Sequence, residues 1–307
     1  MSAHTRAWLQ IHFCVVLWGF TAILGKLITL AALPLVWWRM VLVSAALLLM
    51  RRFWSGLPAL SPRLIAVYAG IGVLVALHWL TFYGSIKLSN ASVAATCMAL
   101  IPVFVSLLEP FLVRRRFEPS ELLFGLAVVP GVALVVGGTP QDMRSGIAIG
   151  VLSAIFAALF GSLNKRYIGG SSALTVTGIE IGAGALFVTL AAPLIPGDAV
   201  PFVWPEPHDA ALLAFLAIGC TLLPFALALV ALRQLSAFTA ALAINLEPVY
   251  AIVLAMALLG EQHELARGFY AGVAIILAVV FLHPWLQQRL QHRLQTRMSR
   301  APPRAGL

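Results

Sequence analysis

Long apolar runs separated by short polar breaks dominate the sequence. The runs occupy residues 10–30, 34–50, 64–84, 90–113, 121–139, 146–164, 172–195, 210–231, 236–259 and 267–285. Most are close to the roughly 20 residues that an α-helix needs to cross the hydrocarbon core of a bilayer. The breaks carry Pro, Gly and charged residues, as at Arg51-Arg52, Thr139-Pro140 and Gly260-Glu261, which favour turns. The pattern therefore predicts an all-α polytopic membrane protein with ten transmembrane helices.

The composition agrees with this prediction. Of 307 residues, 61% are hydrophobic and 10% are charged, and the mean hydropathy is +0.98, whereas soluble domains carry about 25% charged residues. Ten crossings of about 20 residues each leave room for short loops but not for a separate soluble domain. The cysteines Cys14, Cys97 and Cys220 lie far apart inside apolar runs, so neither a disulfide framework nor a metal site is expected. No cofactor is expected.

The basic residues predict the orientation of the chain. If the N-terminus is cytoplasmic, most of the 20 Lys and Arg residues fall in cytoplasmic loops and the C-terminal tail, whereas the loop 196–209 carries Asp198, Glu206 and Asp209 but no basic residue. Cytoplasmic loops are enriched in Lys and Arg, so both termini are predicted on the cytoplasmic side of a bacterial inner (plasma) membrane. Leucines four apart beside arginines in 286–300 predict an amphipathic helix on that face. The net charge of +9 thus indicates a lipid bilayer as partner and no nucleic acid.

An internal repeat divides the sequence into two halves. Placing Pro102 on Pro248 aligns the Ala-rich residues 91–95 with residues 237–241. Each half holds five helices, an odd number, so the second half is expected to be inverted across the membrane. Inverted repeats are an architecture of secondary transporters, with the substrate site at the repeat interface. The predicted domains are a first repeat at 1–140, a second, inverted repeat at 141–285 and a cytoplasmic tail at 286–307.

Short motifs in these runs resemble a known family. They are Trp18-Gly19 and Lys26 in the first run, Pro34 and Arg39 in the second, 82–87 (FYGSIK) in the third, Pro102 in the fourth, Gly219 and Thr221 in the eighth, and 246–248 (LEP) with 259–261 (LGE) in the ninth. In order and spacing they are similar to the drug/metabolite transporter superfamily, in particular its EamA-type ten-helix exporters, from Ile11 to His283. The resemblance implies a central cavity lined by helices 1–4 and 6–9, with helices 5 and 10 peripheral. The sequence departs from the family pattern at Arg114–Arg116, where a Gly-Glu pair is usual, and this leaves the substrate open.

Polar groups near the middle of the ninth run are candidates for function, since a carboxylate in a membrane segment is costly unless it faces protein or water. Asn245, Glu247 and Pro248 stand almost together there. Proline removes a backbone donor, and Pro102 is its counterpart in the fourth run, so both are predicted helix breaks. Glu247 either contacts or couples the substrate or locks two helices, and Asn245 either binds solute or bridges spans. Glu247 stands opposite Ile101 in the repeat alignment, which makes it an asymmetric element suited to coupling or gating.

The third and seventh runs add a histidine and a second carboxylate. His78 is followed by Trp79 and Tyr83, and residues four apart share a helix face. In a cavity His78 could relay a proton or bind a carboxylate; it could equally be a packing residue held by a hydrogen bond. Glu180 stands in the sequence Gly-Ile-Glu-Ile-Gly, whose glycines permit close helix approach. It is expected to face a cavity or a basic partner rather than lipid.

Arg39 and several aromatic residues complete the candidates for substrate binding or gating. Arg39 follows two tryptophans, and its guanidinium could bind a carboxylate through two parallel hydrogen bonds. Trp18, Trp79, Tyr83 and Tyr250 could line a cavity, or could belong to the aromatic belts of the membrane interface.

Together these features predict a secondary transporter that moves a small organic metabolite by alternating access. The candidate groups suit an amino acid or a related zwitterion, and export is favoured from the resemblance alone. The alternatives are an aromatic-drug efflux carrier and a passive uniporter or channel of the same fold. A membrane-embedded enzyme is disfavoured, because the sequence lacks a Gly-x-Ser-x-Gly nucleophile and a His-Glu-x-x-His zinc pair. Gly268 and Gly272 in the tenth run would permit dimer packing, although a monomer is favoured.

Overall fold

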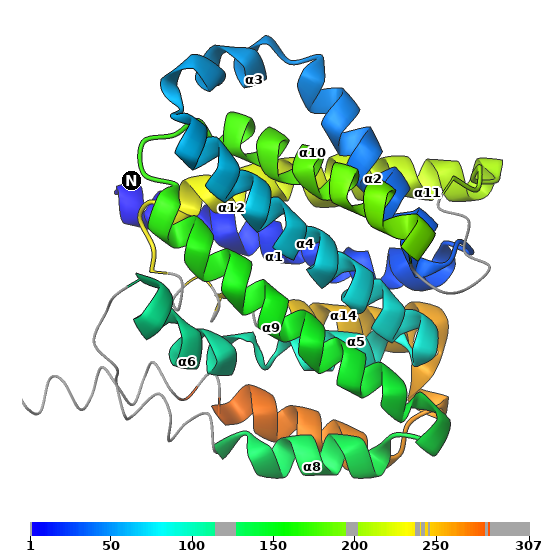
Figure 1. Cartoon of the computed structure of the whole chain (residues 1–307). Coiled ribbons are helices and arrows are strands. Elements are labelled where there is room, and N and C mark those ends of the chain that lie inside the picture. The colour runs from blue at the N-terminus through cyan, green and yellow to red at the C-terminus, as the bar shows by residue number, and fades with distance from the viewer. Residues whose placement is uncertain are drawn as a thin grey trace, which may run out of the picture.

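The computed structural model describes residues 2–113, 127–194, 202–236, 240, 243–244, 246–279 and 282. Throughout these residues the chain forms helices and their connections, without a strand (Figure 1). The principal helices are α1 (Ala3–Leu27), α2 (Ala32–Leu48), α3 (Arg51–Gly56), α4 (Pro62–Leu88), α5 (Ala91–Met98), α6 (Ile101–Val113), α8 (Val129–Gly138), α9 (Arg144–Tyr167), α10 (Ala173–Ala191), α11 (Pro207–Ala217), α12 (Leu223–Leu232), α14 (Leu246–Leu259) and the helix Arg267–Val279. The all-α fold class is therefore confirmed for the described part of the chain.

Several of these segments are long and apolar enough to cross a membrane, as in a multi-pass membrane protein. The six that qualify alone are Ala3–Leu27, Pro62–Leu88, Ala91–Val113, Gln141–Tyr167, Ala173–Leu194 and Pro207–Leu232. Ala32–Leu48 and Arg51–Ala59, bent by 79°, form a seventh if the pair is one span. Val129–Gly138, Leu246–Leu259 and Arg267–Val279 are shorter apolar helices. Each of the ten predicted runs contains a helix, whereas ten complete crossings stay a prediction.

Helix ends follow capping signals in the sequence. Before α4, the hydroxyl of Ser61 accepts a hydrogen bond from the N–H of Leu64. Before α5, the side-chain oxygen of Asn90 accepts one from the N–H of Val93. Such side chains satisfy backbone donors that have no partner inside the helix. After α14, Gly260 has a φ of 70°, which is the left-handed conformation that glycine adopts without strain.

Prolines interrupt the helices beside the centre of the bundle. The segment Ala91–Val113 breaks ahead of Pro102, where α5 ends and α6 begins. A π-helical turn precedes α12, in which Pro224 is the second residue. Proline cannot donate to the carbonyl four residues earlier, and π-turns accommodate such irregularities, often near functional sites. Pro248 lies on α14, and its role as a helix break stays a prediction.

Glycines allow close helix contacts. A Cβ atom on Gly72 of α4 would lie 2.1 Å from the carbonyl oxygen of Glu180 on α10. In the same way, a Cβ on Gly272 would lie 2.5 Å from the carbonyl oxygen of Gly131 on α8. α8 and the helix Arg267–Val279 lie side by side at the lower edge of Figure 1. The glycine face that the sequence offers for dimer packing is thus used inside the chain, against α8.

Candidate functional site

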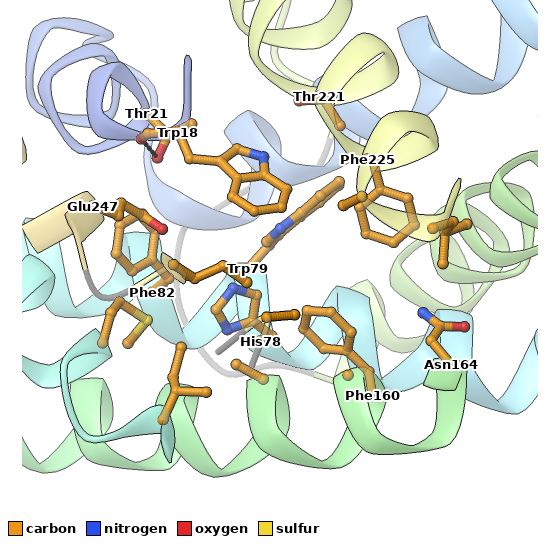
Figure 2. A pocket seen from close by; sticks show the side chains of 18 of the residues that line it. Trp18, Thr21, His78, Trp79, Phe82, Phe160, Asn164, Thr221, Phe225 and Glu247 are labelled. Carbon is orange, nitrogen blue, oxygen red and sulfur yellow. Dashed lines mark hydrogen bonds between the residues drawn. The ribbon is translucent and has the colours of Figure 1, made fainter. Parts of the chain in front are cut away.

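A cavity lies between helices that are far apart in sequence. It encloses about 130 Å³ and is lined from α1, α2, α4, α5, α6, α9, α12 and α14. Its aromatic wall is formed by Trp18, Trp79, Phe82, Phe160 and Phe225. Its polar groups are Thr21, Arg39, His78, Asn164, Thr221 and Glu247 (Figure 2). An apolar cavity with a few polar groups directed into it is the usual form of a small-molecule site.

Arg39 brings a fixed positive charge to this cavity. Its side chain is 2% exposed. Nε donates to the hydroxyl of Thr221 at 2.6 Å, and Nη1 donates to the hydroxyl of Tyr83 at 2.8 Å. The guanidinium carbon lies 3.7 Å from the ring centre of Trp79, in cation–π contact. All of these partners are neutral, so they orient the guanidinium and leave its charge available to an anionic group.

Glu247 brings a carboxylate to the same cavity. It lies on α14. Figure 2 shows it at one side of the pocket, near Trp18 and Thr21, with Phe225 at the other side. Glu247 is close enough to interact electrostatically with Arg39, yet no ion pair joins these two described side chains. The cavity therefore holds one positive and one negative group that do not neutralise each other by direct contact.

His78 lines the cavity with its ring fixed to α9. Its Nδ1 lies 3.0 Å from the carbonyl oxygen of Ser153 and 2.9 Å from the Ser153 hydroxyl oxygen. A carbonyl oxygen only accepts, so a proton on Nδ1 donates to it. The ring also contacts Phe82 and Phe160. His78 is thus a packing residue held by a hydrogen bond that also lines the cavity, and its role in proton relay or carboxylate binding stays a prediction.

Glu180 does not line the cavity, and one residue that does, Asn164, lies between them. Its side chain is fully buried on α10. The amide nitrogen of Asn164 donates to Glu180 Oε2 at 3.4 Å, and Asn164 itself lines the cavity. Glu180 faces protein, but it neither lines the cavity nor forms an ion pair with a described basic residue, the two roles that the sequence offered; it meets the cavity through this amide.

The remaining predicted residues lie at the margin of the cavity or outside the described chain. Tyr83 is fully buried and contacts the cavity through Arg39. Tyr250 is 41% exposed and packs α14 against α1, where a Cβ on Gly19 would meet it at 2.9 Å; it is not part of the cavity wall. Asn245 lies outside the described residues. Pro102 is buried at the start of α6 and Pro248 is buried on α14, both beside the cavity.

Sequence reasoning missed Asn164 and the serine that fixes the histidine. Asn164 directly precedes Lys165-Arg166, so its polarity resembled the start of a loop rather than part of a buried site. Ser153 is a small residue within an apolar run, where serine is common. The available signal was that each is a polar residue in or beside an apolar run, which does not identify a partner.

The groups on this site can bind a solute without covalent chemistry. Across the described residues no group of three or more His, Cys, Asp and Glu side chains could hold a metal ion. The thiols Cys14, Cys97 and Cys220 are buried, and none of them lines the cavity. What remains is a guanidinium, a carboxylate, an imidazole and aromatic faces.

Beyond the cavity in one direction, carboxylates accept hydrogen bonds, Asp209 and Glu261 from backbone N–H groups and Glu264 from the Asn90 side chain; we refer to Asp209, Glu261 and Glu264 as the acidic end. Glu261 accepts from the N–H groups of Ala91 and Ser92 at 3.0 and 2.8 Å, and from the Ser92 hydroxyl at 2.6 Å. These donors belong to the first turn of α5. The acidic end lies at the right in Figure 1, where α14 ends.

In the other direction, Lys and Arg side chains donate hydrogen bonds to backbone carbonyl oxygens; we refer to Lys165, Arg166 and Arg233 as the basic end. Lys165 Nζ donates to the carbonyl oxygen of Leu232 at 2.7 Å. Arg166 donates to the carbonyl oxygen of Leu112, and Arg233 donates to that of Ser171. The cavity lining reaches this end, because it includes Leu232 itself.

The comparisons with known proteins agree with this architecture. The chain matches the model of the EamA-like transporter family twice, over residues 6–137 and 144–283. A comparison with curated proteins finds no match. A solved crystal structure at 17% sequence identity has a TM-score of 0.64 to this chain and covers 93% of it and 99% of its own length, a likeness of fold alone. Because the two family matches span nearly the whole sequence, the chain belongs to the EamA-like transporter family, in the drug/metabolite transporter superfamily.

Proposed function

We propose that this chain is a secondary transporter that moves a small organic metabolite, an amino acid or a related zwitterion, through the central cavity by alternating access. Membership of a transporter family supports transport. The substrate class is supported by one observation: Arg39 and Glu247 line the same cavity without forming an ion pair with each other. Export is the favoured direction, from the family resemblance.

The chemistry of the two groups suits the two charges of a zwitterion. A guanidinium offers a planar fork of donors that matches a carboxylate. Glu247 would hold an ammonium group, for which the adjacent face of Trp18 adds a cation–π surface. When a zwitterion binds, Arg39 and Glu247 each exchange water for a partner of opposite charge. A neutral solute would not provide these partners.

The described conformation is proposed as the state open toward the basic end. The cavity lining extends to Leu232 at that end. Toward the acidic end, Tyr83 and Ile86 are fully buried, and Lys87 Nζ donates to the carbonyl oxygen of Ile28 at 2.6 Å. The excess of Lys and Arg at the basic end supports a cytoplasmic position for that end and for both termini.

The proposed architecture is a pair of inverted five-helix repeats, at 1–140 and 141–285, in a bacterial inner membrane. The double family match, with its division between residues 137 and 144, supports two repeats. The use of Gly272 inside the chain supports a monomer.

Counterflow in proteoliposomes tests the proposal. Vesicles that hold the purified chain are preloaded with a mixture of unlabelled amino acids, and uptake of the labelled ones is followed. For an amino acid that is carried, Arg39→Lys keeps the charge but loses the fork, and is expected to lower the rate on the order of 10²-fold. Arg63→Lys, an exposed arginine on α4, is the matched control and is expected to behave like the wild type. Absence of counterflow for every amino acid tested would refute the substrate class.

An aromatic drug is the second candidate solute, because five aromatic side chains line the cavity. A carrier for such compounds would show counterflow with a planar aromatic cation and a strong loss in Glu247→Gln, with little effect of Arg39→Lys. A passive channel would conduct without stimulation by preloaded solute, whereas a passive uniporter would show counterflow without a response to an imposed ion gradient. An enzyme is the least supported alternative, since the family is one of transporters.

A further inference from the structure

Two buried side chains behind the cavity wall have polar atoms without partners. Glu180 is 0% exposed and Asn164 is 1% exposed. One hydrogen bond joins them, from the amide nitrogen of Asn164 to Glu180 Oε2 at 3.4 Å. Glu180 Oε1 and Asn164 Oδ1 have no hydrogen-bond partner, although both are buried. Buried polar atoms are nearly always paired, so this pair requires an explanation.

An ionised carboxylate does not fit these surroundings. A buried charge is stable only when it is paired and fully hydrogen-bonded, and Glu180 accepts one long bond from a neutral amide. No cation of the described chain forms an ion pair with Glu180. Arg39, Lys165, Arg166 and Arg233 all donate to neutral oxygen atoms of hydroxyl or carbonyl groups.

A single proton supplies what the pair lacks. A protonated carboxyl has one O–H donor, so Oε1–H can donate to Oδ1 of Asn164 while the amide N–H donates to Oε2. Both unpaired atoms are then satisfied by the same bond, and the buried charge disappears. We propose that Glu180 carries an exchangeable proton, held by Asn164, and that this proton is the coupling ion of transport.

This inference rests on the proposed function, because the proton is useful only if it can reach the cavity. Asn164 provides the contact, since it bonds to Glu180 on one side and lines the cavity on the other; Figure 2 shows it at the side of the pocket away from Glu247. The step is a simple dissociation: the O–H bond of Glu180 breaks, the carboxylate keeps the electron pair, and the proton passes to cavity water. Coupling follows if the proton is released in one open state and bound in the other.

The groups around Glu180 do not compete for this role. Tyr68 on α4 interacts electrostatically with Glu180, but its hydroxyl donates to the carbonyl oxygen of Tyr167. Thr177, one turn earlier on α10, has an unpaired hydroxyl and carries no charge. The other titratable or charged residues on the elements around α10 and Asn164 are Arg39 on α2, Arg51 and Arg52 on α3, Arg63, His78, Tyr83 and Lys87 on α4, Glu109 on α6, Arg144, Lys165, Arg166 and Tyr167 on α9, and Arg233 after α12. None of these described residues forms an ion pair with Glu180.

Infrared spectroscopy tests the proton directly, without a substrate. The full chain in lipid vesicles is titrated from acidic to alkaline pH, and the C=O stretch of protonated carboxylic acids is recorded. The wild type is expected to show a buried-acid band at neutral pH that Glu180→Gln removes and Glu264→Gln leaves unchanged. Asn164→Leu, which keeps Glu180, should shift the band to the frequency of an acid with weaker hydrogen bonds. A band that is absent in the wild type, or is kept in Glu180→Gln, overturns the proposal. If Glu180→Gln does not fold, the shift in Asn164→Leu decides, and an unshifted band overturns it.

Flux measurements test the coupling. With an amino acid that shows counterflow, an imposed pH gradient is expected to drive uptake in the wild type and in Glu264→Gln. Glu180→Gln should lose that stimulation completely while it still shows counterflow without a gradient. Stimulation that survives in Glu180→Gln overturns the proposal. If no amino acid shows counterflow, the proposed substrate class fails, and the infrared band still decides whether Glu180 holds the proton.

Discussion

The acidic end and the basic end of the bundle are held by opposite kinds of hydrogen bond. At the acidic end, carboxylates accept from backbone N–H groups, as Glu261 does at the start of α5. At the basic end, ammonium and guanidinium groups donate to backbone carbonyls, as Lys165 does at the last residue of α12. Each choice matches the groups that a helix terminus leaves unpaired and the partial charge of that terminus.

The two ends also differ in burial, and this difference has a functional consequence. Glu261 and Asp209 are 0% and 1% exposed, whereas Arg166 and Arg233 are exposed. Charge-assisted hydrogen bonds gain strength away from water, while exposed ones are screened and contribute little. The cavity extends to the weaker end. The comparison indicates that the acidic end is the strongly closed side in this conformation and that the basic end is closed, if at all, by contacts that are easily exchanged.

Removing the buried carboxylate at the acidic end should have the largest effect. Glu261→Ala leaves the N–H groups of Ala91 and Ser92 and the Ser92 hydroxyl without their acceptor, which is expected to cost about 3 kcal/mol of unfolding free energy. Thermal unfolding of the purified protein in detergent measures this loss as a lower midpoint temperature.

A matched variant is available three residues away. Glu264 is exposed and accepts a single hydrogen bond, from the Asn90 side chain at 2.9 Å. Glu264→Ala is expected to cost about 0.5–1 kcal/mol. Equal effects of the two substitutions would show that burial does not distinguish the carboxylates and would remove the basis for calling this end strongly closed.

The helices were accessible to sequence reasoning because the membrane imposes a length and a composition on each of them. The apolar runs and their breaks at Pro and Gly set the elements, and a helix is found in each. The rotation of each helix about its own axis, which decides which residues face the cavity, was harder to predict. In a membrane protein both the lipid face and the packed face are apolar, so the pattern does not show that Trp18 faces the cavity while Tyr250 lies outside it.

The charged members of the site were also visible in the sequence, because an ionisable residue in an apolar run needs a protein environment. This reasoning selected Arg39, His78, Glu180 and Glu247 individually. It could not supply their partners: Thr221 meets Arg39, and Asn164 meets Glu180, only through packing of helices from distant segments. The tertiary fold determines which side chains form a pair, and their spacing along the chain does not predict it.

A second buried carboxylate allows the comparison to be repeated at the acidic end. Asp209, at the start of α11, accepts from the N–H of Thr29 at 3.0 and 3.2 Å and from its hydroxyl at 2.7 Å. Asp209→Asn keeps the shape but removes the charge and one acceptor, so it is expected to cost about 1–2 kcal/mol. His208→Asn is the control, since that side chain is 72% exposed and its contact with Asp209, at 3.6 Å between Nδ1 and Oδ1, is long. Thermal unfolding of both variants checks the difference, and a loss in His208→Asn as large as that in Asp209→Asn would assign the effect to the loop.

The smallest effect on stability is expected at the basic end. The stability measurement there is therefore combined with a measurement of how accessible the cavity wall is from each side. Lys165→Met removes the bond to the Leu232 carbonyl and is expected to change the unfolding free energy by about 0.5 kcal/mol.

Thiol labelling measures the accessibility of the cavity. With the buried native cysteines replaced by alanine, Leu229→Cys places one thiol on the cavity wall, and a membrane-impermeant thiol reagent is applied from either side of oriented vesicles. Labelling should occur from the basic end at the same rate with and without Lys165→Met, because the bond does not close that end. Adding Glu261→Ala should instead open labelling from the acidic end. Labelling of Leu229→Cys from the acidic end in the absence of Glu261→Ala would contradict the assignment of the closed side.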